Sequence, residues 1–318
     1  METGWERTLP FVQIERIEIE ELFKGVLEKN NIKEISLINE GCRTTNYIIK
    51  STLDKQYILK IFYEKSDSYE REIKLFKMLE GKINISHIYK FDKSEFLEGR
   101  EYTIYGYLDG ETLSNYIQNG NKLNNNMVKQ AAFTLANIHN NKYKQIGFLN
   151  KDLSVQQELP PLIEWYKMFM GKNAQEKMGI ALKEKILNIV ETNKRRLIEL
   201  DTTASLVHGD FQGTNILVNN NTISGILDWE FCMSGHPIAD VAQFFRYDDY
   251  FEHNQIKIFR DEYNKYSSYK LQDDWYELAK LRDLVNLIQL LDKDGYRPNK
   301  DKDIINLIKK SLSRIKFV

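Results

Sequence analysis

Hydrophobic and polar positions along the first third of the chain predict a small sheet with accompanying helices. The segments expected to form strands are residues 35–38, 46–50, 56–62, 85–91 and 101–107. Residues 68–80 instead place apolar side chains at helical spacing, at Ile73, Phe76 and Leu79. Residues 14–30 have the pattern of an amphipathic helix packed on the same unit.

The remainder of the chain has mainly helical periodicity. Apolar side chains recur at helical spacing in residues 113–118, 125–140, 162–170, 175–200, 240–247, 256–266, 274–291 and 304–315. The exception is a stretch with short apolar runs at 205–207, 216–218 and 223–227, each bounded by Gly or Asn. Such runs are typical of buried strands joined by tight turns.

Three polar residues stand at or just beyond the ends of these short strands: Asp210, Asn215 and Asp228. Two carboxylates and an amide in this arrangement suit a divalent ion, a nucleotide and a hydroxyl nucleophile. Mg²⁺ prefers hard oxygen ligands and commonly takes one or two from protein carboxylates and the others from phosphate. Phosphoryl transfer needs little more than an oriented hydroxyl and neutralised charge.

Lys60 is a second candidate, because it lies inside a predicted strand. Alternation places Lys60 on the same strand face as Ile58 and Phe62. A lysine between bulky apolar side chains needs an anionic partner. We expect it to contact nucleotide phosphates, although a lysine that only protects an edge strand from aggregation would give the same local pattern.

Composition narrows the class of protein. The chain has 318 residues, 45 basic and 46 acidic side chains and 42% hydrophobic residues, which indicates ordinary globular packing. The balanced charge gives no support for nucleic-acid binding, and no apolar run has the length of a membrane span. The first residues do not resemble a signal peptide. Two cysteines, Cys42 and Cys232, argue against a disulfide framework, so we expect a cytoplasmic protein.

Together these motifs resemble the aminoglycoside phosphotransferase and choline kinase superfamily, small-molecule relatives of the protein kinases. The resemblance is carried by His208-Gly209-Asp210 with Asn215 five residues after the aspartate, and by Asp228 after a hairpin. Gly235-His236-Pro237 and Asp240 complete the pattern. It covers about thirty-five residues and is specific as an ensemble, although the HGD tripeptide alone would be weak.

The resemblance implies an α+β, bilobal, protein-kinase-like fold. A small antiparallel-sheet lobe, residues 1–107, would bind the nucleotide, and a mainly helical lobe, residues 108–318, would hold the catalytic hairpins and the acceptor. The loop with Gly41, Thr45 and Asn46 would cover the phosphates. Backbone groups of Gly106 and Leu108 would contact the adenine edge, which side-chain identity cannot verify.

The resemblance also implies roles for the site residues. Asp210 would be the base or orienter for the acceptor hydroxyl, and Asn215 and Asp228 would bind Mg²⁺. Lys60 would position the phosphates of ATP or GTP, held by Glu72 of the following helix. Glu70 is the alternative to Glu72.

Residues outside the nucleotide site are expected to be structural. His208 is expected to shape its loop, and His139 to be a hydrogen-bonded core histidine. Asp240 is expected to cap a helix or anchor a loop.

The acceptor is the least constrained part of the prediction. Trp229-Glu230 and then Gly235 follow Asp228 closely, which leaves no room for a protein-docking activation segment and favours a small molecule. The leading candidate for the acceptor is an aminoglycoside or a similar antibiotic. The alternative is choline, another amino alcohol or a sugar. A cationic acceptor would need carboxylates, for which we name Glu230 and the cluster at 248–252. That cluster comprises Asp248, Asp249 and Glu252.

A different class of function is a pseudokinase scaffold that binds nucleotide without catalysis. Such a protein would be expected to lack the base, a metal ligand or the lysine, and this sequence retains all of them. The oligomeric state is not predicted.

Overall fold

The computed structural model describes residues 2, 4–28, 31–39, 41, 43–63 and 69–316. Cys42 and the predicted helix start at residue 68 lie outside these ranges. The first lobe contains α1 (Arg16–Leu22), α2 (Tyr69–Leu79), a short 3₁₀ turn η1 (Glu95–Leu97) and the strands β1 (Ile32–Ile38), β2 (Thr45–Ser51), β3 (Gln56–Ile61), β4 (Ile88–Ser94) and β5 (Arg100–Gly106). The five strands form one antiparallel sheet in the order β1-β2-β3-β5-β4.

Alternation along β3 separates the two faces of this sheet. Tyr57, Leu59 and Ile61 join a buried cluster with Ile19 and Phe23 at α1, so this face is the core of the first lobe. Lys60 points to the opposite face, as expected for a period of two. Phe76 of α2 lies against Tyr105 on that second face, with ring centroids 6.5 Å apart. Lys60 therefore lies on the sheet face that carries α2, and its ammonium contacts Asp228 of the second lobe.

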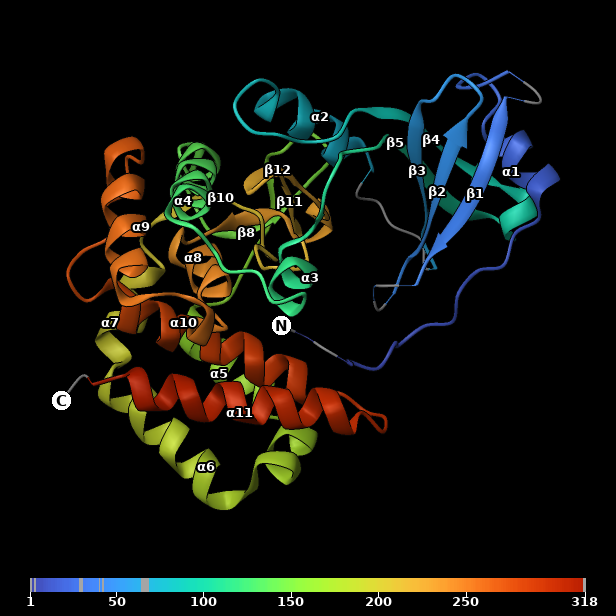
Figure 1. Ribbon diagram of the computed structural model, residues 1–318. Coiled ribbons are helices and arrows are strands. Elements are labelled where there is room, and N and C mark those ends of the chain that lie inside the picture. The colour runs from blue at the N-terminus through green and yellow to red at the C-terminus, as the bar shows by residue number, and fades with distance from the viewer. Residues whose placement is uncertain are drawn as a thin grey trace.

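The second lobe is mainly helical, with short strands that carry its loops. Its helices are α3 (Leu113–Gln118), α4 (Asn125–His139), α5 (Leu162–Phe169), α6 (Lys172–Thr192), α7 (Lys194–Leu200), α8 (Ile238–Phe244), α9 (His253–Tyr266), α10 (Trp275–Leu291) and α11 (Pro298–Arg314). Figure 1 shows α6, α10 and α11 gathered on the side away from the first-lobe sheet. A single large apolar cluster joins these helices and includes Leu75 and Leu79 of α2.

The short strands of the second lobe form two further antiparallel sheets. One has the order β7-β10-β13-β8-β9, with β7 (Lys142–Tyr143), β8 (Gly147–Leu149), β9 (Val155–Glu158), β10 (Ala204–Val207) and β13 (Met233–Gly235). The other has the order β12-β11-β6, with β6 (Glu111–Thr112), β11 (Ile216–Asn219) and β12 (Thr222–Ile226). The turns η2 (Trp229–Phe231) and η3 (Asp248–Tyr250) are 3₁₀ helices. The α+β arrangement with an N-terminal antiparallel sheet confirms the predicted fold class.

Several predicted boundaries were wrong for local reasons. The helix expected over residues 14–30 ends at Leu22, because Gly25 adopts a left-handed conformation with φ 85°. In α2 the buried positions are Leu75 and Leu79, whereas Ile73 is 38% exposed. The segment 175–200 is two helices, α6 and α7, that meet at Asn193. None of the helices in the described ranges has the length and apolar character needed to cross a membrane.

Core packing of α4 generates the first prediction. Leu135 is fully buried in the second-lobe cluster, whereas Phe133 on the same helix is 40% exposed. Leu135→Ala should lower the free energy of unfolding by about 2–5 kcal/mol, because it removes buried methyl groups and leaves a cavity. Phe133→Ala should cost clearly less in the same urea titration. Equal losses for the two variants would contradict this assignment of the core.

Candidate active site

The loop after β10 carries the HGD motif and is held by Asp240. This carboxylate lies fully buried in the first turn of α8 and accepts hydrogen bonds from the backbone N–H of His208, at 2.7 Å, and of Gly209, at 2.9 Å. Gly209 has φ 81°, and a Cβ at this position would lie 2.3 Å from the carbonyl oxygen of Phe231. Only glycine therefore fits the turn that directs Asp210.

His139 completes this buried support. Its Nε2 lies 3.1 Å from Oδ2 of Asp240, and its Nδ1 lies 2.7 Å from the hydroxyl of Tyr263. Burial acts to raise the pKa of Asp240, but the hydrogen bond and charge of His139, together with the amide of His208, hold that pKa below its usual value. His139 is thus a fully bonded core histidine. Asp240 anchors the loop from inside α8 and is not the N-cap, which is Pro237.

Asp210 and Asn215 are brought into direct contact. The Nδ2 of Asn215 donates to the carbonyl oxygen of Asp210 at 2.9 Å and to its Oδ2 at 2.7 Å. This leaves the Oδ1 of Asn215 as the free oxygen of the amide. Burial raises the pKa of Asp210, while the charges of Arg246 and His208 oppose that rise. A carboxylate with a raised pKa accepts a proton more readily than an exposed one.

The β11–β12 hairpin carries Asn215 and Asp228 to the same end. Ile216 pairs with Ile226, and the backbone N–H of Leu227 donates to the carbonyl oxygen of Asn215 at 2.8 Å. The carbonyl oxygen of Leu227 lies 2.8 Å from Nε2 of His208, which ties the hairpin to the HGD loop. Asp228 itself is left-handed, with φ 64° and ψ 68°. The structure therefore collects Asp210, Asn215 and Asp228 in one place.

Lys60 reaches this group from the first lobe. Its ammonium contacts the carboxylate of Asp228 directly and lies 3.8 Å from the carboxylate of Glu230. Lys60 is only 9% exposed, and burial would lower its pKa. The charges of Asp228, Glu230 and Glu72 outweigh that effect and raise it, so the lysine is charged. Burial would likewise raise the pKa of Asp228, but Lys60 holds that pKa below its usual value.

Glu72 lies beside this pair but has a different direct partner. Both of its carboxylate oxygens accept from the Tyr105 hydroxyl at 3.0 Å, and its interaction with Lys60 acts through the electrostatic field. Burial raises the pKa of Glu72 to about 7 against the charge of Lys60. The alternative, Glu70, instead forms an exposed ion pair with Lys151 at 3.0 Å.

The predicted nucleotide loop lies next to Lys60 in the sheet. Asn46 pairs with Lys60 in the β2–β3 register, and Oγ1 of Thr45 accepts from the backbone N–H of Val12 at 2.9 Å. The carbonyl oxygen of Gly41 accepts from Arg7 at 2.7 Å. Positions 40 and 42 of this loop lie outside the described residues.

The predicted adenine contacts follow β5. The backbone N–H of Gly106 donates to the carbonyl oxygen of His87 at 2.8 Å, and its carbonyl oxygen accepts from the Ser86 hydroxyl. The side chain of Leu108 packs so closely on Gly225 that a Cβ there would lie 2.6 Å from it. Of the two backbone groups of Gly106, only the carbonyl retains spare capacity, through its second lone pair.

The structure separates the four predicted acceptor carboxylates. Glu230 lies beside Lys60, and burial together with Asp228 raises its pKa. Asp248 instead bonds Tyr276 at 3.0 Å, Lys280 at 3.4 Å and Arg314 at 3.1 Å. Asp249 pairs with Lys310 of α11, and Glu252 caps the start of α9. Only Glu230 is therefore brought together with the HGD loop and hairpin.

Sequence reasoning missed Arg246, which adjoins the site. Its guanidinium makes a bidentate pair with Asp283, at 2.9 and 2.8 Å, and donates to Gln212 at 2.9 Å. Gln212 in turn bonds the backbone of Asp210 through its own N–H. The available signal was an arginine directly after the apolar run Phe244-Phe245, which suggests a buried charge but names no partner.

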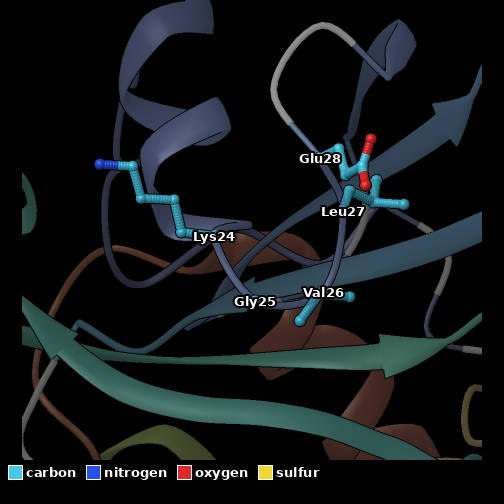
Figure 2. Close-up of a pocket in the computed structure, with 5 residues that line it drawn as sticks. All are labelled: Lys24, Gly25, Val26, Leu27 and Glu28. Carbon is cyan, nitrogen blue, oxygen red and sulfur yellow. The ribbon is translucent and has the colours of Figure 1, made fainter.

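The surface hollow that is lined by residues 24–28 lies elsewhere, in the turn after α1 (Figure 2). The side chains of Lys24 and Glu28 extend from opposite ends of this turn. It contains none of the residues described above, so we assign it no part in the site.

Asp240 generates the second prediction. Asp240→Asn replaces an acceptor oxygen with N–H, which leaves buried donors of the HGD loop or of His139 without a partner. Each such loss costs about 1–3 kcal/mol, so the free energy of unfolding should fall measurably in a urea titration. Asp249→Asn, which disrupts an exposed pair with Lys310, should cost about 0–1 kcal/mol.

The same substitution should alter acid stability. A depressed folded-state pKa gives a contribution that is present above the unfolded carboxyl pKa and lost as pH falls through the folded one. The Asn variant should therefore lose less additional stability below about pH 4 than the wild type. A variant that matches the wild type in both titrations would show that Asp240 does not hold the loop.

Solved structures with the same fold include small-molecule kinases. A thermostable mutant of aminoglycoside phosphotransferase APH(4)-Ia, in a ternary complex with ADP and hygromycin B, superposes with a TM-score of 0.69 at 15% identity and covers 95% of this chain and 100% of that one. Choline kinase LicA from Streptococcus pneumoniae gives 0.64 at 17% identity, covering 93% and 98%. The GDP and kanamycin complex of APH(2")-IIia gives 0.67 at 15%, covering 95% and 100%. At these identities the likeness shows the fold.

A search among curated proteins found no significant match. The family model described as the phosphotransferase enzyme family matches residues 34–281, most of the chain and both lobes. This confirms the resemblance drawn from the HGD motif and its following hairpin. The chain therefore belongs to the phosphotransferase enzyme family.

Proposed function

We propose that this chain transfers the γ-phosphoryl group of ATP or GTP to a hydroxyl of a small molecule, in the cytoplasm. One observation carries the proposal. Lys60 of the first lobe contacts Asp228, which lies in the second lobe together with Asp210 and Asn215. The nucleotide would lie between the lobe of residues 1–107 and the lobe of residues 108–318. Its phosphates would face Lys60, and its base would lie near Gly106 and Leu108.

The residues fit a divalent ion of the hard type. Asn215 offers its Oδ1 because its Nδ2 is bound to Asp210, and the Asp228 side chain is 37% exposed beside it. No cluster of three or more acidic, His or Cys side chains that could hold a metal occurs among the described residues. Mg²⁺ with one or two protein ligands and the rest from phosphate matches that donor set. When bound, such an ion neutralises charge on the phosphates.

Asp210 is proposed to orient the acceptor and receive its proton. The acceptor oxygen attacks the γ-phosphorus, the bond from the γ-phosphorus to the bridging oxygen breaks, and the nucleoside diphosphate leaves. The hydroxyl proton passes to the Asp210 carboxylate, whose burial favours the protonated form. Lys60 would balance the negative charge of the phosphates, since it is buried, charged and close to Asp228.

An aminoglycoside or similar antibiotic remains our leading acceptor, with choline, another amino alcohol or a sugar as the alternative. Glu230 supports a cationic acceptor, because it is a partly buried carboxylate within reach of the proposed reaction centre. The three carboxylates at 248–252 give less support, since each has a partner within the second lobe.

The test is a screen for release of ADP or GDP across aminoglycosides, other hydroxylated antibiotics, choline, ethanolamine, homoserine and sugars. Acceptor-dependent release, with the phosphorylated product identified by mass, is expected. Nucleotide binding without any phosphorylated product would instead support a pseudokinase scaffold.

The third prediction concerns the base. Asp210→Asn should lower kcat by about two to four orders of magnitude, the usual effect of removing a positioned base, while nucleotide affinity changes little. Steady-state kinetics with the best acceptor and a nucleotide-binding titration give the two quantities. Near-full kcat in this variant would remove Asp210 from the mechanism.

The fourth prediction concerns the metal ligands. Asp228→Ala should abolish Mg²⁺-dependent nucleotide binding, and Asn215→Ala should raise the Mg²⁺ concentration needed for it. Titration of Mg²⁺ at fixed nucleotide measures both, with Asp249→Asn as the matched control at a surface carboxylate. If neither variant changes the metal requirement, the proposed ligands are wrong.

A further inference from the structure

The N-terminal segment crosses from the first lobe to the second and lies against α11 (Figure 1). Trp5 attaches this segment to α11. Its Nε1 donates to Oδ2 of Asp303 at 3.0 Å, and the ammonium of Lys300 lies 4.2 Å from its ring centroid. A tryptophan held by both a hydrogen bond and a cation–π contact is a firm attachment point.

The next two residues tie this segment to both lobes. The Glu6 carboxylate accepts from the backbone N–H of Asn299 at 2.9 Å and of Lys300 at 3.1 Å, so it caps the start of α11. The Arg7 guanidinium donates to the carbonyl oxygens of Gly41 and Thr44, both at 2.7 Å. The segment thus connects the predicted phosphate loop with α11.

This attachment places Glu2 beside the catalytic loop. The backbone N–H of Glu2 donates to the Tyr247 hydroxyl at 3.1 Å, and that hydroxyl donates to Asp303 at 2.6 Å. Among the described residues, none forms a hydrogen bond with the solvent-shielded Oε1 of Glu2. Burial raises the pKa of Glu2 to about 7, and the nearby charges of Asp210 and Asp303 act in the same direction.

The cations near Glu2 do not provide it with an ion pair. Arg246 is held in its bidentate contact with Asp283, and Lys300 lies over the ring of Trp5. Both act on Glu2 through the electrostatic field and lower its pKa, but less than burial raises it. A carboxylate with one solvent-shielded oxygen, near the charges of two other carboxylates, is stabilised by a cation that reaches it.

We propose that Glu2, with Asp303 beside it, binds a positively charged group of the acceptor next to Asp210. The N-terminal segment is then part of the acceptor site and sets a preference for amines or quaternary ammonium groups. This inference rests on the phosphotransferase function proposed above. It assigns the cation to residues remote in sequence from Glu230 and from the 248–252 cluster.

The test is calorimetric binding of kanamycin and of choline to the full chain saturated with Mg²⁺ and ADP. Glu2→Gln keeps the shape of the side chain and removes its charge, so affinity for the probe that binds should fall about tenfold or more. Glu28→Gln, an exposed first-lobe position, should bind like the wild type. Unchanged ADP affinity in both variants shows that the fold is intact.

Choline carries a fixed charge, so its pH dependence reports on the protein. The groups around Glu2 are Asp210, Asp303, Arg246, Lys300 and Tyr247. Since burial raises the pKa of Glu2 to about 7, wild-type affinity for choline should rise from pH 6 to pH 8. Glu2→Gln should remove that rise.

The proposal is overturned if Glu2→Gln binds the probes as tightly as the wild type, or if the wild type binds neither probe. Because binding is measured without turnover, this failure is distinct from failure of the proposed function. The latter would appear as absent phosphoryl transfer to every acceptor in the screen, while cation binding could still be measured.

Discussion

The charge balance around Lys60 is the constraint on which the site depends. An ammonium that is almost fully buried stays charged only if carboxylates surround it, and here they come from both lobes: Glu72 from the first, Asp228 and Glu230 from the second. A buried charge without its partner costs several kcal/mol, so this group resists separation of the lobes. The same carboxylate that balances Lys60 is the proposed metal ligand.

The second lobe holds its half of the site by an independent buried network. Asp240 fixes the backbone of the HGD loop and is itself fixed by His139, while the carbonyl oxygen of Leu227 joins that loop to the hairpin through His208. All members of this network belong to the second lobe, so the network that positions Asp210 does not depend on a first-lobe residue.

Local pattern predicted most of the fold, because apolar periodicity decides which face of an element is buried. The motif residues were predictable because each polar side chain stands at or just beyond the end of a short apolar strand, next to a tight turn. Boundaries failed where one residue overrode the pattern, as Gly25 did after α1. The surroundings of Arg246 and Glu2 were not predictable, because their partners lie far along the chain, at Asp283 for the one and Tyr247 for the other.

The most direct measurement is the thermal stability of Lys60→Met with and without Mg²⁺ in the absence of nucleotide. If Lys60 balances Asp228 and its neighbours, the variant leaves carboxylates unpaired, so its Tm should fall and Mg²⁺ should restore more of it than it adds to the wild type. Lys50→Met, at an exposed pair with Glu34 on β2, is the matched control and should respond as the wild type does. Equal Mg²⁺ responses in Lys60→Met and wild type would contradict the account.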